Sequence, residues 1–477
     1  MKKEKFKGVL AALFTAMCIV FYGCTGDNDI QTLEEEKAVP VEFTPEESHY
    51  MMTEQKGNSV NPQEAIDRVL EHYGTVMTRG ENDLKEVGII YKEEIGKTAK
   101  DTVLPDTLAY MFESKNQRMQ YIVSADNRTN ESLLAEYNKT ETEMDTSQTS
   151  LTIKDIIRKG IANHIRNEII SYEQEKDSIM DEIQKKFTQM ALCDSTSPKR
   201  FTRPIYPHEG DPAPVYQVTE EVLADWHEVA FRDEMIPVWW CQDEPYNWQV
   251  QDLANCPSWS YVPTGCLPTA VAQIMTYWNN PLYVESQLVD WSSLTENIRI
   301  SHNDSIRGNK VAALMKAICI GCNTAFGCGE SFSDIESAVS YLETINFNVG
   351  SIQSYSSSEI YQSLQNSRPV LITGYNCNYD GHAWNIDGYQ RKAKTVRTKT
   401  YIYDEMLEGF RLISTVDHTY YSKLFHYNWG WNGNWNGWFA ENCFDCTTRI
   451  MHPTRNANED SYEYNVEIVT NIYPNNN

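Results

Sequence analysis

The sequence predicts an α+β protein made of two α+β domains in series. Its 477 residues suffice for about two or three domains, and a hydrophobic content of 41% is enough to build their cores. In the first half, strand-like patterns over residues 87–124 precede a strongly helical pattern over residues 153–187. Beyond a proline-rich segment at 193–217, Trp, Tyr, Cys and Gly become frequent, and this change of composition marks a second domain.

The first 24 residues are typical of an export signal. Four lysines lie within residues 1–7, and residues 8–22 are almost wholly apolar but too short to span a membrane comfortably. Cys24 follows Gly23 directly, which resembles a bacterial lipoprotein signal and predicts a lipid on Cys24 as the sole attachment to a membrane. An ordinary signal peptide or an uncleaved anchor is the alternative. The polar, acidic residues 25–55 are predicted to form a tether.

A first domain is predicted over residues 56–195. Asn61 can cap a helix, Pro62 suits its first turn, and Ala65, Val69 and Leu70 share one face. The strand-like and helical patterns that follow complete a compact α+β unit of ordinary domain size.

The segment 196–220 is predicted to be a linker. Five prolines and a Lys-Arg pair at 199–200 lie within residues 193–217, which makes this stretch a candidate for proteolytic cleavage. A second domain is predicted over 221–455, and the remaining residues 456–477 read as a polar C-terminal end.

The charge of the chain argues against nucleic-acid binding. With 67 acidic and 41 basic residues, the net charge is −26, and no basic cluster stands out. The acidity fits the solvated surface of an exported protein.

Most of the 12 cysteines are interpreted as disulfides or buried thiols. Two C-x-x-C pairs, Cys319 with Cys322 and Cys443 with Cys446, could in principle share a zinc ion. Because disulfides or buried thiols explain these cysteines as well, we predict neither a metal nor a cofactor.

Cys266 lies at the start of a predicted buried helix. The apolar residues from Leu267 to Trp278 recur at helical spacing, and Pro268 is best tolerated near a helix start. Backbone N–H groups and the helix dipole favour a thiolate there, and Gly265 allows close approach of other groups. Cys266 is therefore a candidate nucleophile, with a structural cysteine of a core helix as the alternative.

His382 is the candidate base. It follows Gly381 at the start of a strand-like alternation, where its side chain can face a cleft, and residues 369–375 are the expected partner strand. A lone histidine is more often structural than catalytic, so the position alone is weak evidence.

A dense run of Asn, Gly and Trp over residues 426–439 supplies the third element. The side-chain oxygen of Asn428 could accept a hydrogen bond from the imidazole, and Trp429 could shield that bond from water. A carbohydrate-binding aromatic surface is the alternative interpretation of this run.

The order Cys, His, Asn is that of papain-like proteases. Specifically, the chain resembles the streptopain family of bacterial cysteine proteases in four motifs: Q-x-x-P-Y-N (242–247), G-C-L-P-T-A-V-A-Q-I-M (265–275), G-H-A-W-N-I-D-G (381–388) and N-W-G-W-N-G (428–433). The match spans roughly residues 226–450. It implies a papain-like catalytic domain with a helical part and an antiparallel sheet part.

The resemblance also implies roles for five residues. Cys266 would form a thioester with the substrate, His382 would be the general base, and Asn428 would orient His382, with Trp429 packed beside them. Gln242 falls where the family has its oxyanion glutamine, although without the resemblance it reads as a surface amide.

A propeptide is implied further upstream. Residues 121–128 and 134–137 resemble the family's inhibitory propeptide, so the first domain is expected to inhibit a zymogen until the linker is cut. The expected partners are protein or peptide substrates and the chain's own propeptide. The expected location is the outer membrane or cell surface as a lipoprotein, or the exterior after processing.

Two other functions remain open. One is a Cys-His amidase acting on cell-wall peptides, which the Asn428-Trp429 pair disfavours. The other is an inactive family member that binds partners, supported by departures from the family pattern at Leu267, Pro268 and Asn432. The stretch 391–417 between base and orienter is interpreted as an insertion.

Overall fold

In the computed structural model, the described residues are 42–74, 84–95, 101–114, 119–138, 153–195, 215–257, 260–375, 381–404, 408–444 and 464–475. No helix within these ranges combines the length and the apolar character needed to cross a membrane. The predicted signal, Cys24 and most of the predicted tether and linker lie outside the described residues.

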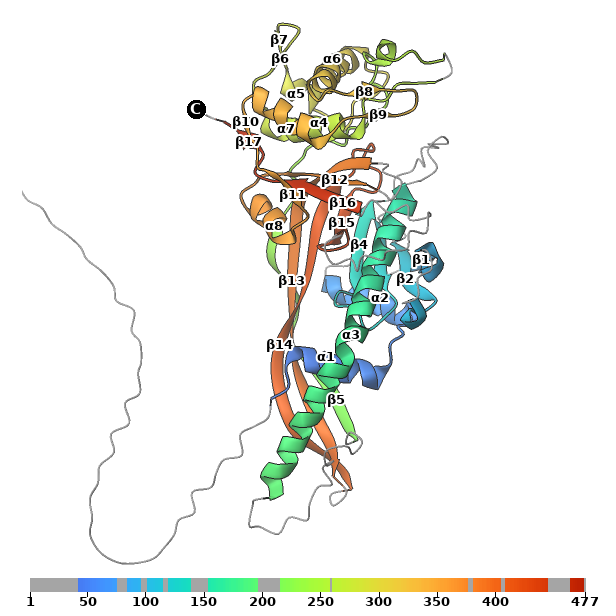
Figure 1. Ribbon diagram of the computed structural model, residues 1–477, viewed down its shortest axis with the longest axis vertical. Coiled ribbons are helices and arrows are strands. Elements are labelled where there is room, and N and C mark those ends of the chain that lie inside the picture. The colour runs from blue at the N-terminus through green and yellow to red at the C-terminus, as the bar shows by residue number, and fades with distance from the viewer. Residues whose placement is uncertain are drawn as a thin grey trace, which may run out of the picture. The chain divides into compact units, whose positions relative to one another are not determined.

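One antiparallel sheet of eleven strands runs through the described residues (Figure 1). Its main path is β1 (Leu84–Tyr91), β2 (Thr107–Ser114), β3 (Met119–Ser124), β4 (Leu133–Asn138), β15 (Gly437–Ala440), β14 (Gly409–Asn428), β13 (Gly381–Asp404), β12 (Val370–Tyr375), β16 (Tyr464–Val469) and β11 (Ile352–Ser354). β5 (Tyr216–Arg232) pairs with β13 off this path. The first four strands come from the predicted propeptide region and the others from the region after the linker.

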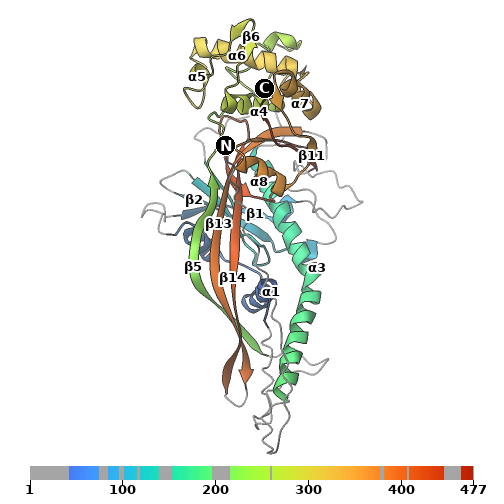
Figure 2. The ribbon, with the colours of Figure 1, turned by 90° about the vertical axis from the view of Figure 1, so that its left-hand side faces the viewer.

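The helices of the first half begin largely as the sequence predicts. α2 (Pro62–Tyr73) is capped by Asn61, whose Oδ1 accepts a hydrogen bond from the Glu64 N–H at 3.0 Å. The helical pattern over 153–187 corresponds to α3 (Ile153–Ser195), which extends further than predicted. Figure 2 shows α3 as one long helix.

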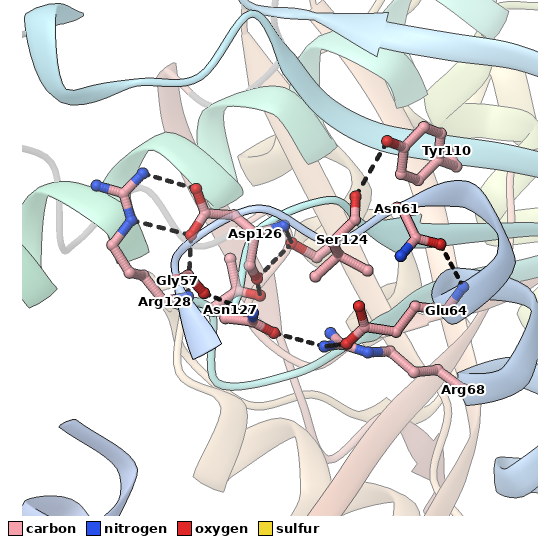
Figure 3. A network of polar contacts seen from close by, with 11 residues as sticks. Gly57, Asn61, Glu64, Arg68, Tyr110, Ser124, Asp126, Asn127 and Arg128 are labelled. Carbon is pink, nitrogen blue, oxygen red and sulfur yellow. Dashed lines mark hydrogen bonds and ion pairs between the residues drawn. The ribbon is translucent and has the colours of Figure 1, made fainter. Parts of the chain in front are cut away.

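A buried ion pair organises this half (Figure 3). The Arg128 guanidinium donates to both carboxylate oxygens of Asp126, at 2.9 and 2.6 Å, and to Glu173 of α3 at 2.7 Å. Arg68 of α2 donates to Asn127 in the same turn. The motif at 121–128 therefore ties β3 to both α2 and α3, because a buried charge is stable only when it is paired.

The prediction of a tether over 25–55 is wrong in its last part, which forms α1 (Pro45–Lys56). Thr44 caps this helix in a reciprocal capping box with Glu47. Tyr50 is buried against Tyr172 of α3, with ring centroids 4.1 Å apart. The helix has little apolar periodicity of its own, and packing against distant residues stabilises it.

Three strands continue beyond the rest of the sheet as a ribbon. β13 pairs with β14 from Asn385 to Asp404, and with β5 from Tyr389 to Ile402. The predicted insertion at 391–417 is the outer part of β13 and β14. Residues 216–220, predicted to be linker, belong to β5, where buried Val218 packs with Ile402 against α1 and α3.

The two halves of the chain meet where β4 pairs with β15. Tyr137 lies opposite Gly437, Glu136 opposite Trp438, and Ala135 opposite Phe439. Residues of both halves share one apolar core around this junction. The predicted propeptide region thus extends the sheet of the region that follows it.

A second apolar core lies among four helices that come after residue 265 in the sequence. These are α4 (Cys266–Trp278), α5 (Trp291–Leu294), α6 (Ser305–Gly321) and α7 (Ile335–Thr344). The helix α8 (Ser357–Gln365) instead packs against β12 and β13 and belongs to the first core. The short elements are β6 (Tyr283–Val284), β7 (Gln287–Leu288), β8 (Ala325–Phe326), β9 (Ser331–Phe332), β10 (Phe347–Asn348), β17 (Tyr473–Pro474), η2 (Lys92–Glu94), η3 (Asp101–Val103) and η4 (Gln251–Leu253). This helical part and the antiparallel sheet confirm the predicted α+β class.

Candidate active site

Cys266 is the first residue of α4, as the sequence predicts. Gly265 precedes it with φ of 93°, a conformation that glycine adopts most easily, and a Cβ there would lie 3.1 Å from the Ser331 carbonyl oxygen. Residues 267–276 are all buried, which fixes the helix in the core. Cys266 itself is partly exposed, whereas the other free cysteines whose side chains are described are buried: Cys241, Cys319, Cys322 and Cys443.

The Cys266 sulfur lies beside the start of β13. Burial raises the pKa of the thiol, while hydrogen bonds from the backbone N–H groups of Ala383, Leu267 and Cys266 itself lower it. The contact with Ala383 brings the sulfur next to the residue that follows His382 in the chain. The N–H groups at the helix start are donors suited to negative charge.

His382 is buried at the second position of β13, and a backbone group holds its ring. Its Nε2 lies 3.0 Å from the Trp429 carbonyl oxygen. Because a carbonyl only accepts, Nε2 carries the proton and Nδ1 is the nitrogen that can take one. Burial lowers the pKa of His382 to about 4, against the opposing effect of the Trp429 hydrogen bond.

The expected hydrogen bond from His382 to the Asn428 side chain is replaced by this backbone contact. Asn428 Oδ1 accepts from Gln273 Nε2 at 3.1 Å, and its Nδ2 donates to the Val238 carbonyl oxygen at 3.0 Å. The predicted orienting role of the Asn428 side chain is therefore wrong for this conformation. The neighbouring Trp429 positions the imidazole through its main chain instead.

Three tryptophans surround the His382 ring. The ring centroids of Trp384 and Trp429 lie 5.8 and 6.3 Å away, and both side chains are fully buried. Trp431 is closer, at 4.2 Å with an interplanar angle of 29°, and is only partly buried. Sequence reasoning singled out Trp429 and missed Trp431, although Trp431 belongs to the same N-W-G-W motif.

Gln242 lies beside the segment that leads to the nucleophile. Its carbonyl oxygen accepts from the Thr264 N–H at 3.1 Å, two residues before Cys266. Within the described part of the chain, its side-chain amide makes no hydrogen bond. The oxyanion role of this amide stays a prediction.

Comparison with known families bears on this arrangement. The model of the Peptidase C10 family matches residues 240–439, which include all five of the predicted catalytic residues. Residues 240–439 are a Peptidase C10 domain. Peptidase C10 is the streptopain family that the motifs indicate, and the domain is a cysteine-type peptidase.

No curated protein matches the chain in a sequence search. Among solved structures, a fragment of prointerpain A from Prevotella intermedia is 15% identical with a TM-score of 0.44, and the match covers 82% of this chain and 98% of that one. Active interpain A from the same organism, a cysteine protease, is 18% identical with a TM-score of 0.35, and the match covers 52% of this chain and 96% of that one.

A second buried histidine of the Peptidase C10 domain is unsuited to the role of base. His426 Nδ1 lies 2.7 Å from Asp387 Oδ1, and its Nε2 lies 3.3 Å from Glu234 Oε2. Burial alone would lower the pKa of His426, but the two carboxylates raise it. With both ring nitrogens held by carboxylates, His426 ties β14 to β13 and to the chain at Glu234.

The two C-x-x-C pairs show no metal site in the described residues. Cys319 and Cys322 are buried free thiols, and nowhere in the described ranges do three His, Cys, Asp or Glu side chains gather as a metal ion would require. Cys446 lies outside those ranges. A disulfide joins Cys256 to Cys328.

Two further polar residues escaped sequence reasoning. Gln273 and Asn385 are fully buried, although each lies inside a motif that the family resemblance rests on. Gln273 interrupts the apolar face of α4, and Asn385 lies three residues after His382. A polar side chain at an otherwise apolar helix position was the signal that could have revealed Gln273.

Proposed function

We propose that this protein is an exported cysteine endopeptidase, made as a zymogen, with Cys266 as nucleophile and His382 as general base. The observation that carries the proposal is the partly exposed residue Cys266 at the start of α4, its sulfur beside the backbone of Ala383, with the neighbouring His382 held through Nε2. This is the arrangement that nucleophile, base and positioning group require.

The geometry supports the following mechanism. His382 Nδ1 takes the thiol proton as the Cys266 sulfur attacks the scissile carbonyl carbon. The oxyanion that forms would be stabilised by the Cys266 N–H at the start of α4 and by the side-chain amide of Gln242. His382 returns the proton to the departing amine, which leaves a thioester on Cys266. Water, deprotonated by His382, then attacks the thioester carbonyl carbon, the C–S bond breaks to release the acid, and His382 returns the proton to the Cys266 sulfur.

Latency of the zymogen is supported by the junction of the two halves. β4 of the propeptide region pairs with β15, and Tyr137 packs on Trp435 and Phe439 at centroid distances of 5.1 and 6.2 Å. Phe439 in turn contacts Trp429, whose carbonyl holds His382. A propeptide bound this way buries the surroundings of the base until the linker is cut.

Attachment to the outer membrane or cell surface through a lipid on Cys24 is part of the proposal. It rests on the sequence alone, because Cys24 lies outside the described residues. Cleavage between α3 and β5 would separate the peptidase domain from that lipid.

The test is intact-mass spectrometry of the full chain treated with an epoxysuccinyl peptide, an irreversible inhibitor of thiol proteases. We expect one adduct, at Cys266, only after limited proteolysis in the linker at 196–214, and none in a Cys266→Ser variant. The same variant should neither cleave peptides nor mature itself. Absence of the adduct in both forms, with all other thiols accounted for, would favour the inactive binding protein instead.

A further inference from the structure

A chain of three buried side-chain amides runs through the region behind Cys266 and His382. Asn385 Nδ2 donates to Gln273 Oε1 at 2.9 Å, and Gln273 Nε2 donates to Asn428 Oδ1 at 3.1 Å. The three side chains are at most 1% exposed. Gln273 is the central member, since both its oxygen and its nitrogen bond to the other two amides.

The same amides are anchored to the main chain. Each one also donates to a backbone carbonyl oxygen, at 3.0 to 3.1 Å: Asn385 to Ala270, Gln273 to Trp240, and Asn428 to Val238. The chain therefore joins α4, β13, the end of β14 and the segment 238–240. These four segments are far apart in the sequence, and no single motif contains the network.

Each joined segment carries one group of the proposed mechanism. In α4, Gln273 lies seven residues after the nucleophile, which is two turns along the same helix face. In the other three segments the group lies within three residues of an amide of the chain or of its backbone acceptor: His382 three residues before Asn385, Trp429 directly after Asn428, and Gln242 two residues after the acceptor Trp240.

We propose that Gln273 is a positioning residue for the peptidase reaction, fixing the nucleophile helix relative to the base, its backbone partner and the oxyanion amide. This inference rests on the proposed function. Apolar packing holds α4 in the core but tolerates small sliding, whereas hydrogen bonds between buried amides are directional and specify one register. A displacement of about 1 Å between reacting groups can cost about a hundredfold in rate.

The test compares variants of the full chain, each processed by the same added protease so that failed self-maturation does not imitate failed catalysis. Gln273→Met keeps the length of the side chain and removes its hydrogen bonds. Val311→Ala opens a cavity in α6, within the same core, and is the control for destabilisation alone. The readouts are kcat and KM for a peptide substrate, the melting temperature, and the rate of Cys266 alkylation by iodoacetamide between pH 5 and 9.

We expect Gln273→Met to lower kcat by about 10-fold to 100-fold, with KM changed less than about twofold and alkylation slowed. Gln273→Glu should recover part of this loss at acidic pH, because a protonated carboxyl keeps an acceptor for Asn385 and one donor. Val311→Ala should lower the melting temperature and leave kcat near that of the wild type.

Two results would overturn the inference. If Gln273→Met melts earlier but matches Val311→Ala in kcat and in its pH profile, Gln273 is structural only. If the wild type itself shows no cleavage that depends on Cys266, the proposed function fails and the positioning role with it. The first outcome leaves the proposed function intact, so the two failures are distinguishable.

Discussion

A single methyl group at Gly437 should loosen the zymogen without affecting the mature enzyme. Gly437 lies opposite Tyr137 where β15 pairs with β4. A Cβ at Gly437 would come within 2.6 Å of the Tyr137 Cα, and its three nearest atoms all belong to Glu136 and Tyr137. Because backbone atoms cannot turn aside as a flexible side chain can, Gly437→Ala has to push β4 away from β15.

The size of the effect follows from the hydrogen bonds at this junction. Three residue pairs and an added bond from the Asn138 N–H to the Asn436 carbonyl hold β4 in place. Loss of two or three such bonds, at about 1 kcal/mol each, weakens docking by about 2–3 kcal/mol. This corresponds to a population of undocked propeptide about 30 to 150 times larger.

The assay is the rate of Cys266 alkylation in the uncleaved full chain, because the zymogen proposal requires that the docked propeptide protects the thiol. We expect the uncleaved Gly437→Ala variant to be alkylated about 30 to 150 times faster than the uncleaved wild type, with the alkylation rate of the processed enzyme as the upper limit. After cleavage, Gly437→Ala and the wild type should react alike. Gly88→Ala is the matched control, since its Cβ would meet only side-chain atoms of Met111 and Arg158, the nearest being the Met111 sulfur at 3.4 Å. Equal rates for the uncleaved Gly437→Ala variant and the wild type would refute a role of this junction in latency.

Two more predictions concern buried histidines, first His382 and then His72. Trp431→Ala should lower kcat of the processed enzyme about tenfold, because the His382 ring loses its closest stacking partner. Trp431→Phe should retain most activity. Equal kcat values for the wild type and both variants would contradict this role of Trp431. The second concerns His72, whose pKa burial lowers to about 3 from an ordinary value near 6.5. Only the unfolded chain then binds this proton between those values, so the zymogen should lose about 2 kcal/mol on going from pH 7 to pH 5. In His72→Phe the drop in melting temperature over this range should be smaller, and an unchanged drop would show that other groups dominate.

Sequence reasoning succeeded where the determinants are local. The apolar face that follows Cys266 and the proline after it place the start of α4 correctly, and Asn61 caps α2 as its residue type suggests. It failed for α1, whose stability depends on Tyr172 more than 100 residues away. It also missed β5, because the strand that pairs with it lies about 170 residues further along and its own residues are largely exposed.

The positioning of His382 shows a different limit. A motif identifies side chains, so the sequence pointed to the Asn428 amide as the partner of the imidazole. The partner in the structure is the carbonyl oxygen of Trp429, a main-chain group that every residue possesses and that no residue type signals. The Asn428 side chain is used in the amide chain behind the site instead.

The electrostatics of the pair fit a latent enzyme. Burial raises the pKa of the Cys266 thiol and lowers that of His382 to about 4, so both effects favour the neutral pair over thiolate and imidazolium. The apolar core that contains Trp384 and Trp429 also contains residues of β3 and β4, so under the zymogen proposal the first domain contributes to this burial. Release of the propeptide would hydrate the edge of this core and reduce the cost of both charges. The zymogen would then hold the thiol in its unreactive protonated form, and alkylation of the uncleaved chain should rise more steeply between pH 7 and pH 9 than alkylation of the processed enzyme.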